Sequence, residues 1–322
     1  MGKSLAAGGG SAYPPSYSAV PESVDASSLV ARLRAAGCVY AEDEAAALLG
    51  AAGRPGRGAT WLADAVARRV AGAPLEHLLE EVVLAGERIA VAPGVFVPRA
   101  RTRVLVDVAR ERLPLGGVLL ELCCGAAPVA TLVGRDRPDV TALAADVDAA
   151  AVAVARRNLA GLGGLAGPAE AHGGDLYDAL PPRWRGRVDV LAANAPYVPS
   201  AAVATMPREA RDHEPRVALD GGPDGTSVQQ RVLAGAAAWL RPGGILAIET
   251  SRAGAPALAD RFRAHGFVPE VRVDDDVDGT AVVGRLAGAR AGQYGDGASP
   301  TSGAPGGRRR DDGGPERRGG HA

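Results

Sequence analysis

Between about residue 100 and residue 286, the sequence alternates apolar runs short enough for strands with longer stretches of helical spacing. Three of the apolar runs lie at 117–122, 140–145 and 188–193. Strands separated by helices enter a sheet through crossover connections, which make the strands parallel and cover both faces of the sheet with helices. This alternation therefore predicts an α/β fold built on a mostly parallel sheet.

The first of these runs leads into a turn of small residues at 123–128 and then into an apolar helix start at 129–133. A strand, a tight turn and a helix N-terminus form the unit in which a nucleotide approaches the backbone closely. Asp146 ends the next strand, where a carboxylate can bind both hydroxyls of a ribose. Only Gly125 remains of the glycines that admit a pyrophosphate, and Glu121 at the strand end disfavours phosphate. The pattern favours S-adenosylmethionine, an adenosine with a positive, phosphate-free tail.

The third run ends at the tetrapeptide Asn194-Ala195-Pro196-Tyr197. An Asn side chain offers both an acceptor oxygen and donor hydrogens, and the carbonyl before Pro196 is free to accept a second hydrogen bond. Tyr197 can lie against the flat face of a planar amide or amino group held there. Alone, a four-residue turn with Pro more often only connects two elements. Its position at a strand end, beyond Glu121 and Asp146, favours a site.

Taken together, these residues resemble the protein N(5)-glutamine methyltransferases, whose known members methylate a glutamine in peptide-chain release factors. The chain is most similar to a divergent branch with Asn-Ala-Pro-Tyr in place of Asn-Pro-Pro-Tyr, and the resemblance covers roughly residues 25 to 286. The similar segments are 74–78 at the end of a helical domain, 91–99 in a linker, 121–130 in the cofactor loop, Asp146, 194–197, the long loop 214–225 and the late strand 243–249.

The resemblance implies a seven-stranded, mostly parallel, Rossmann-like class I methyltransferase sheet with a small N-terminal helical domain. Its last two strands, near 268–273 and 280–286, would form an antiparallel hairpin. The expected organisation is a disordered tail at 1–22, a helical substrate-presenting domain at 23–80, an extended hairpin linker at 81–98, the methyltransferase domain at 99–286 and a disordered tail at 287–322.

The implied activity is S-adenosylmethionine-dependent methylation of a glutamine side-chain amide nitrogen in a protein, for which a release factor is one candidate. The implied catalytic and substrate-binding residues are Asn194, Ala195, Pro196 and Tyr197, with Arg99 as a further substrate contact. The implied cofactor-binding residues are Glu121, Leu122, Cys123, Cys124, Gly125, Asp146, Val147, Asp175, Leu176 and Asn194.

The chain departs from the family pattern at several positions. Cys123 and Ala127 replace two loop glycines. Residues with a Cβ atom can adopt fewer backbone dihedral angles than glycine, so the conformation of the turn is more restricted. Ala195 replaces the first Pro of the motif, but the contact expected there comes from a backbone carbonyl. Arg103 stands where the family usually has Glu, and a Gln that usually follows the late strand is absent. These last two changes bear on substrate identity more than on chemistry.

Charge and cysteine content limit the other function classes. The formal net charge is −1, from 36 basic and 37 acidic side chains, whereas a dedicated DNA-binding surface usually needs a basic excess. Three cysteines, two of them adjacent, suit a reducing cytosol, and no leader or membrane-length apolar run is present. We therefore expect a cytoplasmic monomer without a metal, and we interpret 274–278 as a solvated turn and His213-Glu214 as part of a polar loop.

Two alternatives remain open. Enzymes that methylate the amino group of adenine in nucleic acid use a similar Asn/Asp-Pro-Pro-Tyr motif. A non-catalytic binding module that keeps the cofactor fold is the other alternative, because loop glycines are missing at Cys123 and Ala127.

Overall fold

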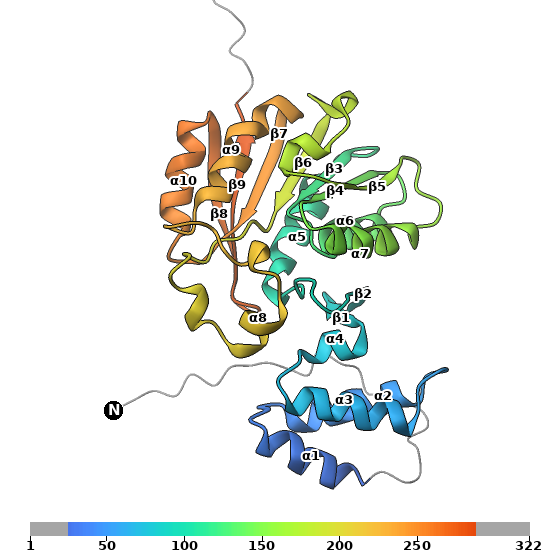
Figure 1. The fold of residues 1–322 in the computed structure, drawn as a ribbon. Coiled ribbons are helices and arrows are strands. Elements are labelled where there is room, and N and C mark those ends of the chain that lie inside the picture. The colour runs from blue at the N-terminus through green and yellow to red at the C-terminus, as the bar shows by residue number, and fades with distance from the viewer. Residues whose placement is uncertain (1–24, 288–322) are drawn as a thin grey trace, which may run out of the picture. The chain divides into compact units, whose positions relative to one another are not determined.

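The structure of the chain is a computed structural model that describes residues 25–287 (Figure 1). The predicted tail at 1–22, and the predicted tail beyond Ala287, lie outside the described residues. In residues 25–287, no helix combines the length and the apolar character needed to cross a bilayer.

The chain begins with helices that share a small apolar core. Asp25 caps the first of them by accepting hydrogen bonds from the backbone N–H groups of Ser27 and Ser28 at 3.0 and 3.2 Å. Leu33 and Leu48 are fully buried between these helices, whereas Val70 at the end of the third helix is 42% exposed. The helices are α1 (Ala26–Ala35), α2 (Ala41–Ala52), α3 (Ala59–Val70) and α4 (Leu75–Leu79).

A short hairpin follows the helices. It consists of β1 (Glu81–Leu84) and β2 (Glu87–Ala90), which pair antiparallel. Residues 91–99 then run without regular structure to the 3₁₀ turn η1 (Ala100–Thr102), which leads directly into α5 (Arg103–Arg112). The predicted extended linker therefore contains a hairpin only in its first half.

The remaining strands form one seven-stranded sheet in the order β5-β4-β3-β6-β7-β9-β8. The pairs from β5 to β7 are parallel, and β9 runs antiparallel to both β7 and β8. This confirms the predicted seven-stranded, mostly parallel sheet with a C-terminal hairpin. The strands are β3 (Val118–Leu122), β4 (Thr141–Asp146), β5 (Ala169–Gly173), β6 (Val188–Ala193), β7 (Leu240–Glu249), β8 (Phe267–Asp274) and β9 (Gly279–Leu286).

Helices cover both faces of this sheet (Figure 1). Leu119 and Val190 pack in the core under α5, α6 and α7, whereas the next residues, Leu120 and Leu191, pack in the core under α9 and α10. Because both faces are buried, the strands are continuous apolar runs rather than alternating ones. These helices and the short turns are α6 (Pro128–Asp136), α7 (Ala149–Ala160), η2 (Leu176–Ala179), η3 (Pro182–Trp184), η4 (Val203–Thr205), α8 (Arg208–His213), η5 (Arg216–Ala218), α9 (Ser227–Trp239) and α10 (Ala255–Ala264).

The strand order reverses at β3, whose neighbours β4 and β6 lead away in opposite directions along the sheet. Leu122 at the end of β3 pairs with Ala145 on one side and Ala193 on the other, so the three carboxyl ends are level. Open α/β sheets bind their ligands at this kind of switch point, outside the carboxyl ends of the strands.

Candidate active site

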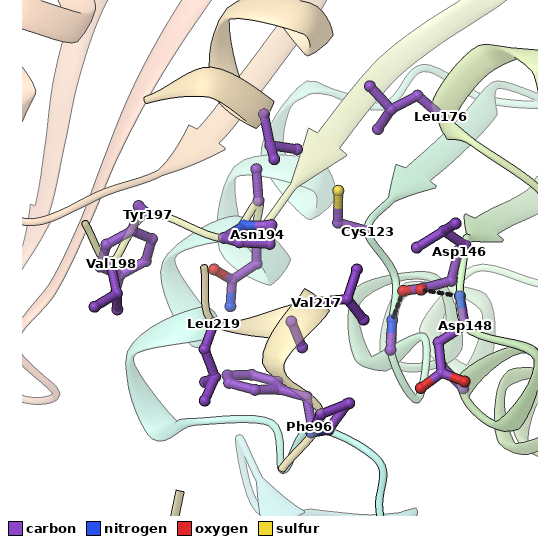
Figure 2. A pocket seen from close by; sticks show the side chains of 18 of the residues that line it. Phe96, Cys123, Asp146, Asp148, Leu176, Asn194, Tyr197, Val198, Val217 and Leu219 are labelled. Atoms are coloured by element: carbon purple, nitrogen blue, oxygen red, sulfur yellow. Dashed lines mark hydrogen bonds between the residues drawn. The ribbon is translucent and has the colours of Figure 1, made fainter. Parts of the chain in front are cut away.

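A cavity of about 340 Å³ lies at the carboxyl ends of β3, β4 and β6 (Figure 2). Of the sequence-predicted site residues, those that line it are Arg99, Cys123, Gly125, Asp146, Val147, Asp175, Leu176, Asn194, Ala195, Pro196 and Tyr197. Figure 2 shows Asn194 and Tyr197 on one side of the cavity and Asp146 on the other. Segments that are far apart in the sequence therefore meet around one space.

Asp146 is held by two backbone amides. One carboxylate oxygen accepts from Gly125 N–H at 2.8 Å and the other from Asp148 N–H at 2.9 Å (Figure 2). Burial raises the pKa of Asp146, although these hydrogen bonds act in the opposite direction. A carboxylate can accept about four hydrogen bonds, so both oxygens keep lone pairs for hydroxyl donors in the cavity.

The loop after β3 has the backbone conformation of a glycine-rich turn, although Cys123 and Ala127 stand in place of two glycines. Cys123 and Ala127 have φ of 52° and 54°, in the left-handed region, as does Gly125 at 52°. This conformation costs a side-chain-bearing residue roughly 1–2 kcal/mol. The replacements of loop glycines therefore introduce strain and leave the turn itself in place, with the N–H of Gly125 pointing at Asp146.

Glu121 and Leu122 in β3, and Cys124 in the loop, do not line the cavity. The Glu121 carboxylate accepts from the N–H groups of Val129 and Ala130, at 3.3 and 2.7 Å, in the first turn of α6. Complete burial raises the pKa of Glu121 to about 8. In this structure its two oxygens face the N-terminal turn of α6, so a direct cofactor contact by Glu121 stays a prediction.

An ion pair borders the cavity at the end of β5. Asp175 accepts from a guanidinium nitrogen of Arg231 at 2.7 Å, and both side chains are about half exposed. Arg231 lies on α9, and no local motif around it indicates a site. Only the packing of α9 against the sheet brings it to Asp175.

The tetrapeptide at 194–197 follows β6 directly, and Ala195 is fully buried. The Asn194 side-chain nitrogen donates to the hydroxyl of Thr102 at 3.3 Å. The guanidinium of Arg101 lies 5.7 Å from the centre of the Tyr197 ring, within range of a cation–π contact. Burial raises the pKa of Tyr197, so its hydroxyl stays protonated at neutral pH.

The long loop 214–225 packs directly on this tetrapeptide. Val198 N–H donates to the Leu219 carbonyl at 3.2 Å, and Gly221 N–H donates to the Val198 carbonyl at 2.8 Å. A Cβ atom on Gly221 would lie 2.6 Å from the Pro196 carbonyl oxygen and 2.8 Å from the Tyr197 Cα. Gly221 is thus required because two backbone segments touch at this point.

Glu214 lies in the predicted polar loop, but its side chain is buried. It is only 6% exposed, and one of its oxygens accepts from the Arg99 guanidinium at 2.6 Å and from Val97 N–H at 3.2 Å. Burial raises the pKa of Glu214, against the effect of Arg99. Arg99 therefore joins the linker to the long loop while it lines the cavity.

The apolar residues at the mouth of the cavity were missed by the sequence reasoning. They come from the linker, from the loop after β6 and from the long loop, and are Phe96, Met206, Val217 and Leu219.

Arg103, a departure from the family pattern, points away from the cavity: it makes two hydrogen bonds of 2.7 Å to Asp274 at the end of β8. The predicted solvated turn at 274–278 therefore includes an anchor for α5.

Residues 88–211 match the family described as methyltransferase small domain. The release factor glutamine methyltransferase of Moorella thermoacetica is 37% identical over 219 residues, which make up 67% of this chain and 75% of that protein. The enzyme of the same name from Mycolicibacterium smegmatis is 34% identical over 66% of this chain and 74% of its own length. This chain belongs to the release factor glutamine methyltransferase family.

Membership of the release factor glutamine methyltransferase family confirms the resemblance seen in the sequence, and it makes the chain a methyltransferase. Among solved structures, a methyltransferase from Pyrococcus furiosus is 17% identical with a TM-score of 0.46, covering 62% of this chain and 89% of that one.

Proposed function

We propose that this protein transfers a methyl group from S-adenosylmethionine to the side-chain amide nitrogen of a glutamine in a protein substrate. The observation that carries the proposal is that Asn194, Ala195 and Pro196 border the same cavity as Asp146. One side of the cavity thus presents amide-binding groups and the other presents a carboxylate to a nucleoside.

The residues on the Asp146 side fit an adenosine. The Asp146 carboxylate has acceptor capacity left for two ribose hydroxyls, and the apolar side chains Val147 and Leu176 border the same space. When bound, S-adenosylmethionine supplies a methyl group on a positively charged sulfur. The carboxylate of Asp146 gives this side of the cavity a polarity that suits a cation, whereas Asp175 is paired with Arg231.

The residues on the Asn194 side fit a primary amide. An amide nitrogen is a poor nucleophile because its lone pair is delocalised into the carbonyl. The Asn194 side-chain oxygen and the Ala195 carbonyl would accept hydrogen bonds from the substrate NH₂ group, which moves electron density to nitrogen and aims it at the methyl group. Positioning of this kind contributes several kcal/mol to lowering a barrier.

Tyr197 would lie against the amide plane and exclude water from it. Burial holds its hydroxyl protonated, so Tyr197 acts by contact and does not act as a base. The alkylated amide is acidic and loses its proton to solvent after the transfer. No other base is needed in the mechanism.

The substrate proposal is a peptide-chain release factor, the protein named in the titles of the relatives. We extend this proposal with two roles expected from the sequence. The helices at 23–80 present the substrate protein, and Arg99 contacts that protein at the cavity mouth. A release factor works on the ribosome, so we propose a cytoplasmic location, and we propose a monomeric enzyme.

The test is incubation of the purified protein with labelled S-adenosylmethionine and a bacterial release factor, followed by mass spectrometry of the labelled residue. We expect one methyl group on a glutamine side chain, and none when that glutamine is replaced by Ala. Label in added RNA or DNA instead would support methylation of an adenine amino group. Absence of cofactor binding by calorimetry would support a non-catalytic module.

A further inference from the structure

A buried chain of hydrogen bonds extends from Asn194 away from the cavity. Asn194 donates to the hydroxyl of Thr102 at 3.3 Å, and that hydroxyl donates to a carboxylate oxygen of Glu249 at 2.8 Å. The second Glu249 oxygen accepts from the Arg101 guanidinium at 3.1 Å. Thr102 is 1% exposed and Glu249 is fully buried, so water does not compete for these bonds.

The direction of these hydrogen bonds follows from the number of protons available. An ionised carboxylate can only accept, so the single proton of the Thr102 hydroxyl goes to Glu249. The Thr102 oxygen can then only accept from Asn194. The amide NH₂ of Asn194 must therefore face Thr102, and its side-chain oxygen is left for the cavity.

The opposite orientation would harm the proposed reaction. A flipped Asn194 would present its own NH₂ group to the NH₂ group of the substrate, and two donors would face each other without an acceptor. The two orientations of an Asn side-chain amide differ little in energy unless hydrogen-bond partners favour one of them. Thr102 and Glu249 supply those partners from segments that come together only in the folded chain, η1 and the end of β7.

Arg101 supports the ionised state of the carboxylate. Burial raises the pKa of Glu249, whereas the hydrogen bond from Thr102 and the charge of Arg101 lower it. Arg101 also lies over the ring of Tyr197. The same guanidinium therefore contacts both the carboxylate behind Asn194 and the aromatic ring beside it.

We propose that Thr102 and Glu249 form a positioning relay that holds the side-chain oxygen of Asn194 toward the methyl-accepting group. Neither residue touches the substrate, and both act through Asn194. The proposal rests on the proposed function, because it assigns a purpose to one orientation of the Asn194 amide.

The first test compares Thr102→Val with Thr102→Ser in methylation of the release factor. Valine keeps the shape and removes the hydroxyl, so we expect kcat to fall by up to about a hundredfold, the effect of a misplaced reacting group, with cofactor affinity unchanged. Serine restores the hydroxyl and most of kcat. Thr280→Val is the matched control, because Thr280 is also buried at 1% and its hydroxyl has no hydrogen-bond partner in the described structure.

Glu249→Gln is a second variant that keeps the volume of the side chain. Arg101 can only donate, so the new amide oxygen would face Arg101 and its NH₂ group would face Thr102. The Thr102 proton would then point at Asn194 and turn its amide around. We expect a kcat loss similar to that of Thr102→Val, with a melting temperature close to that of the unmodified protein.

Wild-type kcat in Thr102→Val or Glu249→Gln, or equal losses in Thr102→Val and Thr102→Ser, would overturn the relay. An unmodified protein that labels no glutamine would instead defeat the proposed function. The relay is then decided by nuclear magnetic resonance of the Asn194 side-chain NH₂ group. Its signals should shift in Thr102→Val and Glu249→Gln but not in Thr280→Val, and unchanged signals in the first two would reject the relay.

Discussion

The two sides of the cavity are built in different ways. On the cofactor side, Cys123 and Gly125 follow β3 and Asp146 ends the adjacent strand β4. On the acceptor side, the Asn194 side chain depends on Thr102, 92 residues away, and through it on Glu249, which is 147 residues from Thr102. The loop 214–225 also packs on residues 194–197.

This difference between the two sides of the cavity indicates which side tolerates amino-acid substitutions better. The cofactor side uses backbone N–H groups and one carboxylate, so Cys123 and Ala127 can replace glycines if the strained backbone is kept. The acceptor side depends on the orientation of one amide, which several long-range contacts determine. We therefore expect substitutions on the acceptor side to abolish turnover, and substitutions on the cofactor side to weaken binding in smaller steps.

The largest effect is expected from Asn194→Ala. Loss of the amide acceptor should lower kcat by roughly a thousandfold, as removal of a preorganised polar group does in other enzymes. The dissociation constant for S-adenosylmethionine, measured by calorimetry, should stay close to that of the unmodified protein. An Asn194→Ala protein that turns over normally would remove the distinction between the two sides.

Gly221→Ala tests whether the long loop holds the tetrapeptide in place. The added methyl group would collide with the backbone at Pro196 and Tyr197. Overpacking of this kind costs about 1–3 kcal/mol, and we expect that loss in denaturant unfolding together with reduced kcat. Gly163→Ala is the matched control, since a Cβ atom there meets no atom within 4 Å and its φ is not positive. Equal stability of the two variants would contradict the contact.

Asp146→Ala tests the cofactor side. Removing a charged hydrogen-bond acceptor should weaken S-adenosylmethionine binding by about 1.5–3 kcal/mol, or roughly tenfold to a hundredfold in dissociation constant. At saturating cofactor, kcat should remain far above that of Asn194→Ala. Asp260→Ala on the exposed surface of α10 serves as the control. Unchanged binding by calorimetry would show that Asp146 does not hold the ribose.

Glu121→Gln is expected to change stability, not turnover, and the change depends on pH. The folded pKa of Glu121 is about 8, above the value near 4.3 of an unfolded chain. Its stabilising contribution is present below the unfolded pKa and is lost as pH rises toward 8. Glutamine cannot ionise, so the free energy of unfolding of the variant should rise relative to the unmodified protein between about pH 5 and pH 8. Parallel pH curves for the variant and the unmodified protein would contradict this.

Much of the fold could be predicted because local patterns determine it. The runs at 117–122, 140–145 and 188–193 became β3, β4 and β6 with small shifts at their ends. The C-terminal hairpin also formed as expected from the resemblance. The exposure of Val70 could not be predicted, because helical spacing does not show which neighbours cover a helix end, and Val70 is the last residue of α3.

The site could be predicted only in part. Asp146 and Asn194 were recognised because each directly ends or follows a strand, and strand ends meet at one edge of a parallel sheet. Arg231 and Glu249 were missed because their partners lie 56 and 147 residues away. Glu214 lies in the expected loop, but its burial was missed because its pairing with Arg99 leaves no mark in the local sequence.

The sequence alone determined the class of fold, the turn after β3 and the tetrapeptide at the end of β6, since each depends on residues close together in the chain. The tertiary structure decided which way the Asn194 amide faces, which glycine of the long loop touches the tetrapeptide and which groups the Glu121 carboxyl contacts. Hydrogen-bond direction and close packing depend on atoms from separate segments, and these atoms become neighbours only when the chain has folded.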